Sequence, residues 1–123
     1  MKISRDSAEG RNAFTAYGEG WVEVNGVRHS SSLVVSGNRL EDNWPVASID
    51  ALTSAHFEAI AKMAPELVLL GSGRAFAFPD PAVLAPLNDA RIGVEVMDTQ
   101  AACRTYNILL GEGRNVLAAL IVA

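Results

Sequence analysis

The chain has 123 residues, of which 50% are hydrophobic and 20% are charged, and its formal net charge is −4. This composition is typical of one compact domain, and a chain of this length buries roughly two-thirds of its unfolded surface without a disulfide or a metal ion. The negative charge and the scattered Arg and Lys positions argue against a nucleic-acid-binding protein. Cys103 is the only cysteine, so the chain has no internal disulfide and we expect no framework of the secreted kind.

The first residues are polar and include Asp6 and Glu9, a pattern that argues against a secretory or mitochondrial targeting peptide. The longest apolar run, at residues 116–123, has the length of a strand and falls short of the ~20 residues that a membrane-spanning helix requires. We therefore expect a cytoplasmic protein with no membrane insertion.

The first third of the chain predicts antiparallel strands. Residues 12–17 and 20–24 are rich in strand-forming side chains, and Asn25-Gly26 follows them directly. Asn-Gly readily adopts the positive φ angles of a type I′ turn, so a β-hairpin is predicted here. Residues 32–35 form a continuous apolar stretch, which is typical of a strand covered on both faces.

The turn residues Gly37-Asn38 are expected to end that strand, and residues 41–45 are expected to form a loop because Pro45 disfavours helix before it. Beyond residue 50, helices and strands alternate. The expected elements are a helix capped by Thr53 or Ser54 and stopped by Pro65, a strand at 67–70, a helix capped by Asp80, a strand at 93–97, a helix from Asp98 to about Glu112, and a strand at 116–122. This alternation predicts parallel strands joined by right-handed crossovers, with helices on both faces of the sheet, in one domain covering residues 1–123.

Ligands of open parallel sheets bind where the strands end, and two predicted loops fall at that edge. One is Gly71-Ser72-Gly73 and the other begins at Asp98. A glycine-rich turn can bind an anion through its backbone N–H groups. Because Phe76 stands where a dinucleotide fingerprint has its third glycine, a plain strand-ending turn is favoured over a nucleotide phosphate site.

The helix after Asp98 contains the most polar side chains near that edge. Arg104 and Asn107 are three residues apart and share one side of the helix, so both could contact one polar group. Cys103 has two interpretations. It is either a reactive thiol activated by Arg104 or by a histidine from elsewhere, or a small buried residue beside two alanines, and the second is favoured.

Other catalytic patterns are missing from the sequence. His29 and His56 lack metal-ligand spacing, there is no Gly-x-Ser-x-Gly motif, and no carboxylate pair can be picked out. We therefore expect no catalytic residues, no metal and no cofactor. Phe76 and Phe78, with Pro79, form either a partner-docking lip or packing over the end of the sheet.

The C-terminal third resembles a known family. Segments 93–99, 101–107 and 112–114, with Ala118-Ala119-Leu120, are similar to small domains whose type member is the archaeal protein Mth nine-three-eight. The family includes assembly factor three of mitochondrial respiratory complex I, and the resemblance extends to Trp44 and the Gly71-Ser72-Gly73 turn. It implies a three-layer α/β fold around a central mixed, largely parallel sheet of about five strands, and no established enzymatic activity.

These observations favour a non-enzymatic binding or assembly module that recognises a protein partner or a small anionic ligand in a cleft, as a monomer or a homodimer. A small enzyme or redox-sensitive protein that uses Cys103 or the Asp98/Arg104 pair stays open as an alternative, as does a purely structural role for Arg104. The predicted binding residues are Gly71, Ser72, Gly73, Asp98, Thr99, Cys103, Arg104, Tyr106 and Asn107.

Overall fold

The computed structural model describes residues 10–123. Its largest element is a five-stranded sheet with the strand order β5-β4-β8-β6-β7. These strands are β4 (Leu33–Ser36), β5 (Arg39–Glu41), β6 (Leu67–Gly71), β7 (Gly93–Met97) and β8 (Val116–Leu120). Strand β6 pairs in parallel with β7 and β8, whereas β4 is antiparallel to both β8 and β5, so the sheet is mixed and its C-terminal part is parallel, as predicted.

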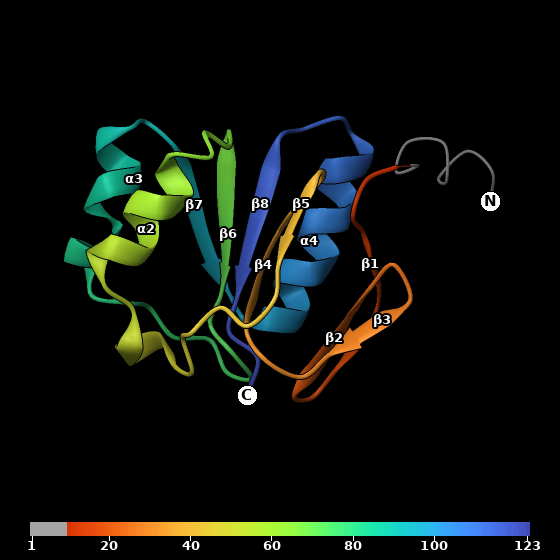
Figure 1. Ribbon diagram of the computed structural model, residues 1–123. Coiled ribbons are helices and arrows are strands. Elements are labelled where there is room, and N and C mark those ends of the chain that lie inside the picture. The colour runs from red at the N-terminus through yellow and green to blue at the C-terminus, as the bar shows by residue number, and fades with distance from the viewer. Residues whose placement is uncertain (1–9) are drawn as a thin grey trace.

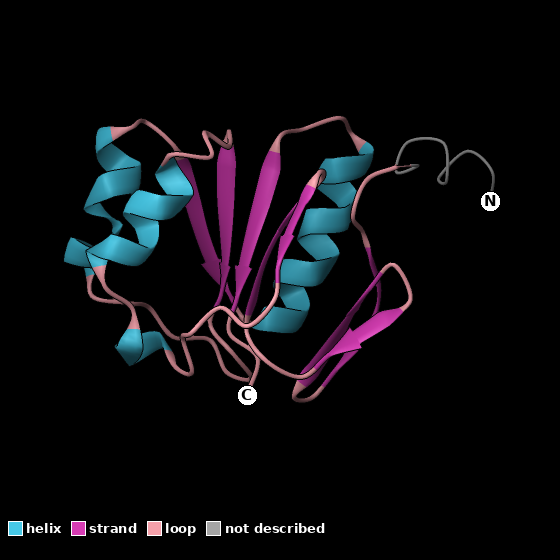
Figure 2. Ribbon diagram, in the orientation of Figure 1, coloured by secondary structure: helices cyan, strands magenta, loops and turns pink. Residues whose placement is uncertain are grey.

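Helices cover both faces of this sheet (Figure 1). Helices α2 (Ser54–Ala61) and α3 (Ala85–Asp89) lie on one face, and α4 (Thr99–Gly111) lies on the other. Beyond α4 is a small antiparallel sheet of β1 (Phe14–Gly18), β2 (Trp21–Val24) and β3 (Val27–His29) (Figure 2). Two short 3-10 helices, η1 (Ile49–Ala51) and η2 (Pro81–Leu84), complete the described elements. The predicted three-layer α/β fold is confirmed.

The apolar strands divide their side chains between two cores because successive residues of a strand point to opposite faces. In β8, Val116, Ala118 and Leu120 face α4 and the small sheet, whereas Leu117 and Ala119 face α2 and α3. All five are almost fully buried. Burial on both faces explains why this strand has a continuous apolar run without a polar alternation.

The predicted Asn-Gly hairpin is confirmed. Asn25 and Gly26 have φ angles of 51° and 85°, as a type I′ turn requires, and Val24 pairs with Val27. The prediction for the next strand was incomplete. Gly37-Asn38 does end β4, but the chain turns straight back and forms β5, an exposed edge strand whose pattern carries no apolar signal.

The helix predicted after Asp80 begins differently from expectation. The Asp80 carboxylate accepts a hydrogen bond from the Ala82 N–H at 3.0 Å, which confirms the cap, but the first turn is the 3-10 helix η2 and the α-helical geometry of α3 follows it. The predictions that concern Asp6, Glu9 and the start of the domain at residue 1 lie outside the described residues. Of the helices in residues 10–123, none has both the length and the apolar character needed to span a bilayer.

Candidate functional site

The turn after β6 and the first residue of α4 lie together at the C-terminal edge of the central sheet, as predicted. The Thr99 N–H donates to the Gly73 carbonyl at 2.9 Å, and the Gly73 N–H donates to the Thr99 hydroxyl at 2.9 Å. The same hydroxyl donates to the Ile121 carbonyl at 2.7 Å, so Thr99 connects the turn to the residue after β8. The Ser72 N–H donates to the Met97 carbonyl at 2.8 Å, so the N–H groups of both Ser72 and Gly73, which an anion would need, are already used.

Close packing at the turn requires a glycine. A Cβ atom added to Gly71 would lie 2.8 Å from Leu120 Cδ2, 2.9 Å from the Thr99 hydroxyl oxygen and 3.1 Å from Thr99 Cα. The last of these contacts is with backbone, which cannot rotate away. Gly71 therefore allows α4 to approach the end of β6, a structural role that does not involve a ligand.

Ser72 organises the loop that follows the turn. Its hydroxyl donates to the Ala75 carbonyl at 2.7 Å and accepts from the Ala77 N–H at 3.2 Å. This loop carries Phe76 and Phe78, which are 56% and 69% exposed and pack edge to face with ring centroids 4.8 Å apart. More than half of each of these two residues is exposed, which favours the partner-docking lip over packing on the end of the sheet.

Asp98 and Arg104 do not form a pair. The Asp98 carboxylate caps α4 by accepting the Ala101 N–H at 2.9 Å, as predicted. Arg104 is exposed and lies over the ring of Tyr17 in β1, 6.0 Å from its centroid. The interaction with the Tyr17 side chain raises the pKa of Arg104 above its usual value. The charged guanidinium therefore faces the small sheet and not Asp98.

Cys103 lies within the core between α4 and the central sheet, and its relative exposure is 0%. Desolvation raises the pKa of its thiol to about 12, although Arg104 opposes the shift. The thiol is therefore protonated at neutral pH and shielded from solvent, which is the opposite of what a nucleophilic or redox-sensitive cysteine needs.

Tyr106 and Asn107 attach α4 to β1. The Tyr106 hydroxyl donates to the Asn12 carbonyl at 2.8 Å, and its buried ring packs edge to face on Phe14. Burial raises the pKa of this phenol. The Asn107 side chain donates to the Phe14 carbonyl at 2.7 Å and accepts from the Phe14 N–H at 2.9 Å, so it pairs with the strand as a neighbouring backbone would.

The hollow at this edge is small, with a volume of about 20 Å³. It lies between the β1–β2 turn, the end of the chain and the start of α4, and Gly73, Thr99 and Arg74 are among its lining residues. Ser72, Asp98 and Arg104 do not line it, so the structure divides the predicted site instead of closing it into one cleft. Their role in binding stays a prediction.

Sequence reasoning missed Arg74 at this hollow. Its guanidinium donates to the Ala123 carbonyl at 3.2 Å and lies against Gly20 of the β1–β2 turn. A lone arginine between two loop residues gives no periodic or motif signal, and its partners are distant in the sequence. Only the fold reveals its position.

The two histidines lie apart. His56 accepts a hydrogen bond from the Thr53 N–H at 3.0 Å at the start of α2, so its side chain caps this helix. His29 ends β3, and its Nε2 atom is buried without a hydrogen-bond partner among residues 10–123. No group of three or more His, Cys, Asp or Glu side chains in that range is arranged to hold a metal ion.

The chain belongs to the family described as protein of unknown function DUF498/DUF598, which matches residues 14–121. The match runs from the first strand of the small sheet to the residue after β8 and includes every α-helix of the described chain. It contains each residue of the predicted site.

Two solved structures share this fold at high similarity. A crystal structure of a Bordetella parapertussis protein is 42% identical, with a TM-score of 0.87, and the match covers 94% of this chain and 99% of that chain. A Bordetella pertussis protein described as a Mth938-like domain is 35% identical, with a TM-score of 0.79, over 91% of this chain and 86% of that one. The predicted resemblance to this group is confirmed.

Two curated relatives carry different names. The bovine NADH dehydrogenase [ubiquinone] 1 alpha subcomplex assembly factor 3 is 36% identical over 104 residues, which are 75% of this chain and 56% of that protein. This chain therefore corresponds to little more than half of the bovine relative. The Francisella tularensis protein named 13 kDa major membrane protein is 26% identical over 122 residues, with 98% of this chain and 99% of that protein covered.

Proposed function

We propose that the protein is a non-enzymatic binding module of the assembly-factor type, and that it contacts a protein partner through the loop after β6. The observation that carries this proposal is the exposed pair Phe76 and Phe78, more than half of whose surface is accessible to solvent. Aromatic side chains of this kind are enriched at the energetically important positions of protein interfaces.

The loop is held in shape before any partner binds. Both hydrogen bonds of the Ser72 hydroxyl connect to the backbone on either side of Phe76, and the two rings support each other edge to face. A surface that is already ordered loses less conformational entropy on binding, which favours affinity. The Ser72 hydroxyl thus stabilises the loop that carries the proposed contact surface.

The enzyme alternative has less support from the geometry. Pockets that bind small molecules usually measure roughly 300–1,000 Å³, whereas the hollow beside Gly73 and Thr99 measures about 20 Å³. Cys103 is buried and protonated, and Asp98 is engaged as a helix cap. This shallow edge of the sheet is too small to enclose a substrate. It can still contact the surface of another protein.

The relatives indicate the class of partner. The bovine relative is named as an assembly factor of NADH dehydrogenase, and we propose that this chain assists the assembly of a multisubunit respiratory enzyme. We also propose a cytoplasmic location, which the single buried cysteine supports. The same proposal includes a monomeric or homodimeric state. It also includes binding of a small anionic ligand by the remaining predicted residues.

The test is affinity purification of the tagged full chain from its own cells, followed by quantitative mass spectrometry. We expect NADH dehydrogenase subunits to co-purify with the native chain and to fall at least about tenfold with a Phe76→Ser/Phe78→Ser variant, as expected for the loss of central interface aromatics. Ile108→Ser is the matched control, because Ile108 is 62% exposed on α4, away from the loop.

Equal recovery of those subunits by the native chain and the Phe76→Ser/Phe78→Ser variant would remove the loop from the proposal. Normal NADH dehydrogenase assembly in cells that lack the protein would remove the assembly role. Recovery of the protein in the membrane fraction after carbonate washing would contradict the cytoplasmic location.

A further inference from the structure

Two adjoining hollows lie at the opposite end of the central sheet, where β8 begins and β4 ends. Their volumes are about 460 Å³ and about 360 Å³, both far larger than the hollow beside Gly73. Both are lined by Asn38, from the β4–β5 turn, and by Asn115, which precedes β8. The two hollows lie on either side of these shared residues, and we call the pair of hollows the basic groove.

Four cationic side chains line the basic groove, and no Asp or Glu of residues 10–123 does so. Arg39 and Lys62 line the larger hollow, and Arg11 and Arg114 line the smaller one. The protein as a whole carries a formal charge of −4, whereas the charged residues that line the basic groove are all cationic. Because the four residues come from distant parts of the sequence, their positions in the sequence do not predict a basic surface.

Two of these cations already have close partners. Arg114 forms two 2.7 Å contacts with Glu66, and that hydrogen bond lowers the pKa of the Glu66 carboxyl. Arg11 donates to the Leu110 carbonyl at 3.2 Å. Both residues are therefore held in place beside the smaller hollow by contacts with the fold.

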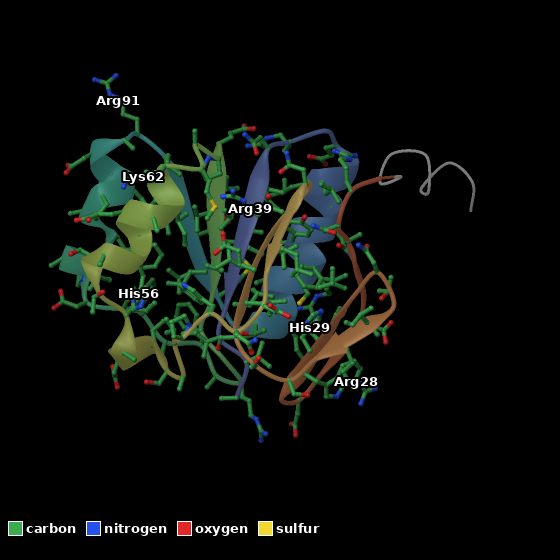
Figure 3. All side chains as sticks on the ribbon, viewed as in Figure 1. Arg28, His29, Arg39, His56, Lys62 and Arg91 are labelled. Atoms are coloured by element: carbon green, nitrogen blue, oxygen red, sulfur yellow. The ribbon has the colours of Figure 1, made fainter. Side chains whose placement is uncertain are left out.

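The other two cations are available to a ligand. Arg39 has only a long 3.8 Å contact with Glu41, in which both side chains are about half exposed. Within residues 10–123 the Lys62 ammonium has no hydrogen-bond or ion-pair partner. Figure 3 labels Lys62 and Arg39 in the upper part of the view, whereas the C-terminus is at the bottom of the same view in Figure 1. Lys62 directly follows α2, and Arg39 is the first residue of β5.

We propose that the basic groove binds an extended acidic segment of a protein partner. Complementary charge selects such a segment. The Asn38 side-chain nitrogen and the Asn115 side-chain oxygen can bond to its backbone, because the fold uses only the other amide atom of each residue, through Ser36 and Ala64. The cations are divided between two hollows, so a ligand that meets all of them must be elongated and carry several negative charges. That the ligand is part of a protein rests on the proposed function.

Fluorescence anisotropy with the full chain and a labelled peptide of about ten residues, alternating Glu and Gly, tests this inference. We expect saturable binding with a Kd on the order of 10–100 µM at low ionic strength, in the range of weak transient contacts. Binding should weaken as salt is added, because the contacting charges are exposed. The matched peptide with Gln in place of Glu should not bind.

Variants locate the site. Lys62→Glu/Arg39→Glu should weaken peptide binding at least about tenfold, since it reverses both available charges. Arg91→Glu, at an exposed arginine outside both hollows, makes the same kind of charge change and should leave the Kd within about twofold. If the double variant does not fold, Lys62→Gln alone should weaken binding several-fold while the circular dichroism spectrum stays native.

Equal binding of the Gln peptide, or equal weakening by Arg91→Glu, would overturn the inference. So would displacement of the labelled peptide by inorganic phosphate or by a short single-stranded oligonucleotide at concentrations equal to those of unlabelled peptide. Peptide binding together with normal NADH dehydrogenase assembly in cells that lack the protein would keep the basic groove and overturn the assembly role. Absence of peptide binding together with failed assembly in those cells would overturn this inference and keep the assembly role.

Discussion

The two ends of the central sheet use polar side chains in different ways. Where β6 and β8 end, Thr99 bonds to backbone groups of two other segments, and Asp98 and Ser72 bond to backbone groups of their own helix and loop. Where β8 begins, Lys62 and Arg39 line the larger hollow. The first end contains the Gly71-Ser72-Gly73 turn, which the sequence marks as a candidate site. The second end contains the hollows that are large enough for a ligand. A polar motif at the conventional edge of an α/β sheet can thus be required for the fold itself.

The largest expected effect tests the packed end. Gly71→Ala should lower the free energy of unfolding by about 3 kcal/mol, because the new Cβ would meet Thr99 Cα and Leu120 at distances that demand movement of α4. Urea denaturation followed by circular dichroism measures this change. Gly111→Ala is the control, since nothing lies within 4 Å of its added Cβ, and a helical position favours alanine. A loss at Gly71 no larger than at Gly111 would contradict the packing account.

The next effect concerns the attachment of β1 to α4. Asn107→Ala should cost about 2 kcal/mol, because the Phe14 N–H and carbonyl both lose a partner. Hydrogen exchange should accelerate at the Phe14 amide more than at amides of β6. If Asn107→Ala leaves stability and exchange unchanged but reduces binding of a partner, the residue belongs to a binding site, as first predicted, and the comparison between the two ends fails.

The pH dependence tests the environment of Cys103. The folded-state pKa of about 12 lies above the unfolded value of ~8.5, so the unfolded chain releases this proton first. The stabilising contribution is complete below the unfolded value and is lost as the pH rises toward the folded one, at up to about 1.4 kcal/mol per pH unit. The free energies of unfolding of the native chain and of Cys103→Ala are compared between pH 8.5 and 10, and their difference isolates the contribution of the thiol. This range lies below the raised pKa of the Tyr106 phenol in the folded state.

Alkylation gives a second view of the same thiol. Iodoacetamide at neutral pH should leave native Cys103 unlabelled over hours and should label it rapidly once denaturant is added, because the side chain is fully buried. Mass spectrometry of the intact chain reads the result. Labelling of the native protein at the rate of a free thiol would restore the redox alternative.

The smallest expected change in stability is that of Tyr106→Phe, which removes only the hydroxyl that donates to the Asn12 carbonyl. The expected loss is about 1 kcal/mol, the usual net value of one hydrogen bond. A thermal or urea midpoint measures it, and the ring contact with Phe14 should remain. A loss of several kcal/mol would mean that the hydroxyl organises more of the seam between α4 and β1 than one bond.

Much of the fold could be predicted from the sequence because the relevant signals are local. The Asn25-Gly26 turn, the Asp98 cap and Gly113 after α4, with a φ of 81°, each depend on the preferences of one or two residues. Strand β5 could not be predicted, since Arg39–Glu41 is fully exposed and has no apolar pattern. It is held by antiparallel pairing with β4 and by the side chain of Asn12, which donates to the carbonyls of Ser36 and Arg39.

The candidate site was predicted only in its components. Helix spacing correctly placed Arg104 and Asn107 on one side of α4, but that side faces β1, and the sequence does not encode which element covers it. The basic groove was not predicted because its cations are brought together only by the sheet order β5-β4-β8-β6. Contacts between distant segments determine whether each of these side chains stabilises the fold or is available to a ligand.

The comparison between the two ends can be tested in one experiment, a nitrogen-15 NMR titration of the full chain with the acidic Glu-Gly peptide. The account predicts shift changes at the amides of Asn38, Arg39, Lys62 and Asn115, and none at Gly73, Thr99 or Arg104. Changes confined to Gly73, Thr99 and Arg104 would contradict it, because they would show that the C-terminal edge of the sheet binds the ligand after all.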